Sequence, residues 1–113
     1  MEDEKYIILN ELIQKDFQMD EEESLISEDE SLDPDTLHKR LSILVAYLLE
    51  NDMHRLLSAM YRLDVSEAKF HEAMYSDSKQ EAAINIADLI IEREMQKVKT
   101  RLHYKKHRKF WLF

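Results

Sequence analysis

The chain has 113 residues, of which 44% are hydrophobic and 35% charged, with one proline, no glycine and no cysteine. This length suits one domain with one core, and the near absence of glycine and proline argues against the tight turns of a sheet-rich fold. The lack of cysteine excludes disulfides, thiolate metal sites and cysteine nucleophiles. We therefore expect an all-α protein, a small bundle of four or five helices with a long C-terminal helix and an acidic flexible linker after the first helix.

The formal net charge of -8 is unevenly distributed along the chain. Residues 1–35 hold 14 acids and 2 bases, residues 36–92 hold 9 acids and 6 bases, and residues 93–113 hold 1 acid and 8 bases. The net charges of the three segments are therefore -12, -3 and +7. The chain is electrically polarised from one end to the other.

The first expected element is an N-terminal amphipathic helix over residues 1–17, because apolar residues recur at spacings of three and four from Tyr6 to Phe17. Residues 18–34 follow, rich in acids and serines. Self-repulsion and little apolar area predict an acidic, mobile linker there. Because the first residues are acidic and no window approaches the roughly 18 apolar residues of a membrane span, we expect a cytoplasmic protein.

Residues 35–104 are expected to form the helical core. Asp33 supplies a cap and Pro34 a first helical residue, after which apolar residues recur at helical spacing. Asp52 interrupts this pattern and is interpreted as the cap of a third helix. One long, bent helix over residues 34–63 remains the alternative.

Two capping patterns predict the last two helices. Asp64-x-x-Glu67 matches a capping box with aspartate in the first position, and Ser78-x-x-Glu81 repeats the pattern with serine. An apolar stripe over five turns then predicts a final helix of about 27 residues, or roughly 40 Å. Because this helix is longer than such a bundle needs, we expect its basic second half to project or to pack on another surface.

The basic second half of the last helix is the first candidate functional feature. Cations on one helix face can follow a phosphate backbone and release its counterions. Basic residues also offset the carbonyl dipole at a helix C-terminus and can pair with the acidic first third, and the acidity of the whole chain favours this structural interpretation. The candidate phosphate contacts are Arg93, Lys97, Arg101, Lys105, Lys106, Arg108 and Lys109.

Residues 105–113, a basic and aromatic C-terminal tail, are the second candidate feature. Four consecutive large apolar residues at its end need a covering surface in water. That surface is the chain's own helix groove, a second copy, a partner protein or an anionic membrane, and one short aromatic cluster gives only marginal membrane affinity. The predicted partner-binding residues are Met95, Val98, Leu102, Phe110, Trp111, Leu112 and Phe113.

Two carboxylate–histidine pairs suggest a metal site. Glu50 and His54, and likewise Glu67 and His71, have the i,i+4 spacing of one helical turn. Helical diiron proteins instead use a Glu-x-x-His spacing with further buried glutamates, and the chain has no such pair. We therefore expect ordinary surface pairs, with no metal and no cofactor.

No pattern typical of an enzyme is visible, since the sequence has neither a glycine-flanked serine nor a phosphate-cradling glycine loop. The methionine- and aromatic-rich segment from Met53 to Tyr75 is interpreted as core packing, with an adaptable partner surface as the alternative. We expect a non-catalytic adaptor or regulatory protein without a small-molecule substrate, forming a homodimer through the last helix, whose stripe leaves apolar area that a monomer does not cover. Nucleic-acid association through the basic helix and membrane docking through the tail are the alternatives.

Overall fold

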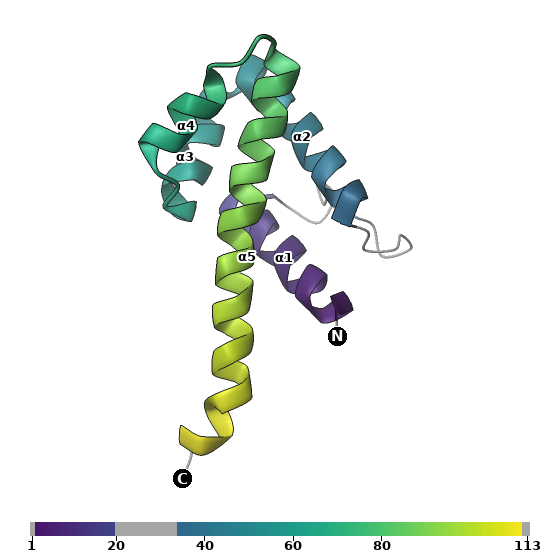
Figure 1. The fold of residues 1–113 in the computed structure, drawn as a ribbon, viewed down its shortest axis with the longest axis vertical. Coiled ribbons are helices and arrows are strands. Elements are labelled where there is room, and N and C mark those ends of the chain that lie inside the picture. Colours follow the sequence, from purple (N-terminus) through teal and green to yellow (C-terminus); the bar gives the residue numbers. More distant parts are fainter. Residues whose placement is uncertain (1, 20–33, 112–113) are drawn as a thin grey trace.

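The computed structural model describes residues 2–19 and 34–111, with the side chains of 5–19 and 34–104. The described residues form helices and no strand, which confirms the all-α bundle with a long C-terminal helix. The helices are α1 (Glu2–Asp16), α2 (Pro34–Asn51), α3 (Met53–Leu63), α4 (Glu67–Met74) and α5 (Lys79–Trp111), shown in Figure 1. Most of the segment predicted to be a mobile acidic linker lies outside the described residues.

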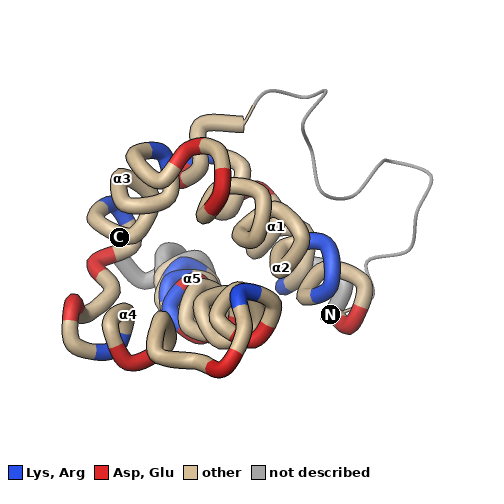
Figure 2. The backbone as a smooth tube through the Cα atoms, turned by 90° about the horizontal axis from the view of Figure 1, so that it is seen from above, with Lys and Arg blue, Asp and Glu red and all other residues tan. Residues whose placement is uncertain are grey.

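α5 is the central helix of the bundle. α1 and α2 lie on one side of it, and α3 and α4 lie on the other (Figure 1). Figure 2, which looks along α5, shows α3 and α4 to its left and α1 and α2 to its upper right. The last turns of α5 extend beyond all of them (Figure 1).

α2 and α3 are separate helices, which resolves the alternative left open by the sequence. The side chain of Asp52 accepts a hydrogen bond from the backbone N–H of Arg55 at 3.1 Å, as a capping residue does. The expected cap is confirmed. The break also places Glu50 on α2 and His54 on α3, so the interpretation of these two residues as neighbours on one helix is wrong.

The cap predicted at Asp64 is wrong, because Asp64 ends α3 instead of starting α4. Its φ of 59° and ψ of 44° lie in the left-handed region, where helices commonly end and where a short polar side chain is tolerated. Ser66 caps α4 by accepting from Lys69 N at 3.4 Å. At the next helix the prediction is confirmed, since Ser78 Oγ accepts from Glu81 N at 3.1 Å.

The core is a single apolar cluster to which the described helices contribute. Core packing accounts for only part of the methionine- and aromatic-rich segment, because Met60 is buried whereas Tyr61 and Tyr75 are 87% and 90% exposed. The largest core residues, each almost fully buried, are Leu9, Ile13, Phe17, Leu37, Leu41, Val45, Leu48, Leu56, Leu63, Ile86 and Ile90.

Candidate functional site

The apolar ridge of α5 that the sequence assigns to a partner is covered in part by the chain itself. Val98 is fully buried, and Met95 and Leu102 are partly buried against the core. α1 contacts α5 directly and brings buried apolar side chains to the same core. The other four predicted partner-binding residues, 110–113, have side chains outside the described part of the chain.

Two of the seven predicted phosphate contacts bind main-chain carbonyl groups at the end of α3. Arg93 Nε donates to Leu63 O at 2.8 Å, and Lys97 Nζ donates to Arg62 O at 3.4 Å. The last carbonyls of a helix have no partner within it, and cations placed there also offset the helix dipole. Arg101 is exposed, and the side chains of the other four predicted contacts, at 105, 106, 108 and 109, lie outside the described residues.

The C-terminal end of α1 is held in the same way, by arginines of α3. Arg62 Nη1 donates to Asp16 O at 3.1 Å, and Arg55 Nε donates to Phe17 O at 3.1 Å. The ends of α1 and α3 therefore meet beside α5, and each end is capped by basic side chains from another helix.

A buried group of three charged residues lies at this meeting point. We call it the acid pair cluster and define it as Asp16 of α1 with Glu94 and Lys97 of α5. Glu94 is 0% exposed and Asp16 6%. Lys97 Nζ lies 3.3 Å from Asp16 Oδ2 and 3.7 Å from Glu94 Oε1. Two carboxyl groups therefore share a single ammonium group inside the bundle.

Glu94 has an unusual environment for an acid. The pKa of Glu94 is raised from 4.5 to about 8, mainly because the group is buried and further because of a hydrogen bond with Asp16 and the negative charge of Asp16, while Lys97 lowers it. In the ionised form neither carboxylate oxygen has a hydrogen-bond donor. A proton on Glu94 gives this carboxyl group an O–H that can donate to the carboxylate of Asp16, which removes the repulsion between two carboxylates.

Sequence reasoning missed Glu94, although two signals pointed to it. It is the only acid among residues 93–113. It also stands four residues before Val98 and eight before Leu102, on the face that the apolar stripe predicts to be buried. An acid at such a position needs a partner, and that partner comes from the opposite end of the sequence.

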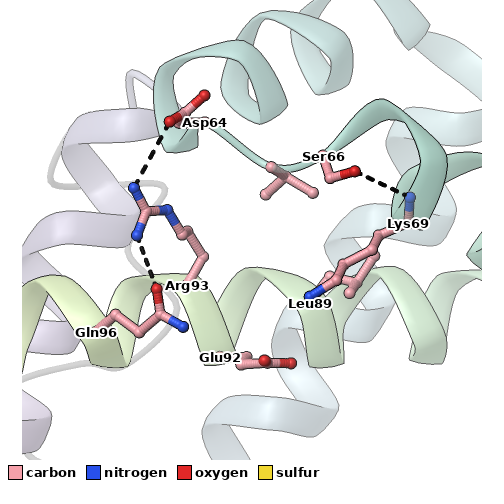
Figure 3. A pocket seen from close by; sticks show the side chains of 8 residues that line it. Asp64, Ser66, Lys69, Leu89, Glu92, Arg93 and Gln96 are labelled. Carbon is pink, nitrogen blue, oxygen red and sulfur yellow. Dashed lines mark hydrogen bonds and ion pairs between the residues drawn. The ribbon is translucent and has the colours of Figure 1, made fainter.

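A shallow pocket lies on the other side of α5, where the α3–α4 turn meets it (Figure 3). Its volume is about 250 Å³. Arg93 reaches across it, with Nη2 3.8 Å from Asp64 Oδ2 and Nη1 2.8 Å from Gln96 Oε1. Its acids and bases balance, so the pocket offers no net attraction to a charged ligand. The lining residues are Asp64, Val65, Ser66, Lys69, Leu89, Glu92, Arg93 and Gln96.

Two further polar contacts join α2 to α5 across the surface of the bundle. His38 Nε2 lies 2.6 Å from Asp88 Oδ1, and Lys79 Nζ lies 3.2 Å from Glu50 Oε1. Among the described residues no group of three or more histidines and acids is arranged to hold a metal ion. Within the same residues no helix is long and apolar enough to cross a membrane.

Comparison with known proteins yields no relative: no family model, no curated protein and no solved structure matches this chain. The functional assignment therefore depends on the geometry of the described residues. Their best-defined polar feature, the acid pair cluster, lies at a contact between helices and not in a cleft.

Proposed function

We propose that this chain is a non-catalytic interaction protein that pairs with a second copy of itself through the second half of α5. The observation that carries the proposal is the length of α5, whose last turns extend beyond the other helices (Figure 1). Tyr104, in the last third of α5, is 65% exposed. A projecting helix with aromatic side chains gains free energy by packing on another helix.

The charge of the projecting part favours an antiparallel pair. Residues 105–113 carry four bases and no acid, so two parallel α5 ends would bring like charges together. An antiparallel, two-fold symmetric pair instead directs each basic end toward the bundle of the other copy. The same surface patch then serves both copies.

This proposal is preferred to nucleic-acid binding because the two internal cations, Arg93 and Lys97, already bind carbonyl groups of α3. Membrane docking would rest on the tail alone, and one short aromatic segment binds membranes only marginally. The role that fits such pairing is that of an adaptor or regulatory protein, and the lack of cysteine is compatible with a cytoplasmic location.

Light scattering of the purified chain tests the proposal. We expect a mass of twice 13.6 kDa at micromolar concentration, and a monomer when the chain is shortened to end at Tyr104. Tyr104→Ser, which keeps the full length, should weaken the dimer, whereas Tyr61→Ser on α3 should leave it unchanged. Circular dichroism confirms that each variant stays helical. A monomeric full-length chain would overturn the proposal.

A further inference from the structure

The acid pair cluster joins α1 to the rest of the bundle. Asp16 lies at the last residue of α1, and its two partners, Glu94 and Lys97, lie one turn apart on α5. All three side chains are largely withdrawn from water, with exposed fractions of 9%, 0% and 29% respectively. α1 therefore cannot dock on α5 without bringing its carboxylate against a second buried acid.

This contact is favourable only when one proton is present. With Glu94 neutral, its O–H donates to Asp16, and Lys97 balances the one remaining negative charge. With Glu94 ionised, two carboxylates face each other around one ammonium group, and the Glu94 oxygens have no donor. Burying an unpaired charge is costly, so the docked arrangement retains the proton.

α1 is the helix with the longest connection to its neighbour in sequence. In sequence, residues 17–33 separate it from α2, and in space it contacts α5 and α3. A single helix of 15 residues is only marginally stable in water. The helical state of α1 thus depends on its docking.

We propose that α1 is a reversible cover on α5, and that its closure is coupled to the uptake of one proton by the carboxyl group of Glu94. Release of α1 frees Asp16 and returns Glu94 to water, where it ionises as an ordinary glutamate. Rising pH therefore favours release and falling pH favours closure.

The other charged groups around the cluster adjust the position of α1 but do not supply the proton. On α3, Arg55 and Arg62 bind the terminal carbonyls of α1 through their guanidinium groups, which stay charged at all relevant pH values. On α5, Lys97 lowers the pKa of Glu94, because its positive charge favours the ionised carboxylate. The inward face of α2 at this core consists of leucine and valine side chains. Proton uptake on closure is accordingly assigned to Glu94.

Release of α1 has a consequence for association. Val98 and Leu102 share a helix face with Glu94 and are buried or partly buried in the closed form. Both belong to the second half of α5, so release would enlarge the surface through which two copies pair. This consequence, unlike the proton coupling itself, rests on the proposed function.

Amide hydrogen exchange of α1 tests the proton coupling. The exchange rates of the Leu9 and Ile13 amides are measured from pH 6 to pH 9 in the natural chain and in Glu94→Gln, whose neutral amide cannot ionise. Dividing the two rates at each pH removes the intrinsic pH dependence of exchange. We expect the ratio to rise on the order of tenfold per pH unit up to about pH 8 and then to level off.

Glu92→Gln is the matched control, because Glu92 is an exposed glutamate of the same helix and this variant should behave like the natural chain. Faster exchange of α1 amides than of α2 amides in the same sample identifies local release rather than global unfolding. A ratio independent of pH, or a single common rate for α1 and α2, would overturn the proposal. If Glu94→Gln does not fold, a natural chain whose α1 exchange follows only the intrinsic pH dependence overturns it equally.

Light scattering of the natural chain at pH 6 and pH 9 separates the two proposals. A stronger dimer at pH 9, together with faster α1 exchange, supports both. Faster α1 exchange without any dimer at either pH supports the proton-coupled cover and overturns the proposed self-association.

Discussion

Two neighbouring residues of α5 belong to charged groups that contribute very differently to the stability of the fold. Arg93 faces the pocket and lies 3.8 Å from Asp64, with side chains 35% and 90% exposed. Glu94, the next residue, faces α1 and is 0% exposed. An exposed ion pair contributes about 0–1 kcal/mol, whereas a buried acid makes folding depend on a proton. Burial, more than charge or sequence position, decides which of the two groups affects the free energy of folding.

A large loss of stability is expected when an apolar core side chain next to the acid pair cluster is removed. Phe17 is 1% exposed and directly follows Asp16. Phe17→Ala should lower the free energy of unfolding by about 3–5 kcal/mol, because it leaves a cavity in the core. Urea denaturation measures this change. The control is Tyr75→Ala, at a residue 90% exposed, which should stay within about 0.5 kcal/mol; equal losses in the two variants would contradict the contrast.

Glu94→Gln should stabilise the chain, by an amount that depends on pH. The folded pKa of Glu94 is raised to about 8 from its ordinary value of 4.5, so the folded chain binds a proton that the unfolded chain has lost. The gain should vanish below pH 4.5, grow as pH rises, and stay constant above about pH 8, where the pKa difference corresponds to roughly 4–5 kcal/mol. Urea denaturation at pH 4, 6 and 8 measures it. A gain independent of pH would contradict the proton linkage.

Lys97→Met should destabilise the chain by about 2 kcal/mol, since it leaves the carboxylate of Asp16 buried without its ammonium partner. It should also raise the pKa of Glu94 further, because Lys97 lowers it in the natural chain. Lys79→Met is the matched control, because the Lys79–Glu50 pair has side chains 72% and 59% exposed. Thermal unfolding of both variants compares them, and similar losses would show that burial does not separate the two lysines.

The smallest effect is expected on the pocket side of α5. Arg93→Gln removes the exposed pair with Asp64 and one hydrogen bond to Leu63 O. We expect a loss of at most about 1 kcal/mol, part of it screened by salt. Urea denaturation at low and high ionic strength measures both parts. A loss of stability as large as that of Lys97→Met would contradict the expectation that the exposed pair contributes less than the buried cluster.

The helical fold followed from local signals in the sequence. Pro34 begins α2, Asp52 caps α3 and Ser78 caps α5, as the residue types predict. Asp64 did not follow the prediction, because the same residue type serves two purposes. In a chain without glycine, aspartate also fills the left-handed position that ends a helix, and a capping pattern alone does not distinguish these roles.

The acid pair cluster could not be predicted in the same way. Its members stand at positions 16, 94 and 97, and no sequence period links α1 to α5. The sequence consequently predicts Arg93 and Lys97 as possible phosphate contacts, although both bind α3 carbonyls in the fold. Helical spacing gave the face on which Glu94 lies, but the identity of its partner depends on how the helices pack.

The most direct measurement is a pH titration of the Glu94 side-chain carbon by nuclear magnetic resonance in the natural chain. Burial beside Asp16 predicts a pKa of about 8 for this carboxyl group, with the signals of α1 residues changing over the same pH range. A midpoint near the ordinary value of 4.5 would contradict the claim that a proton on Glu94 holds α1 against α5.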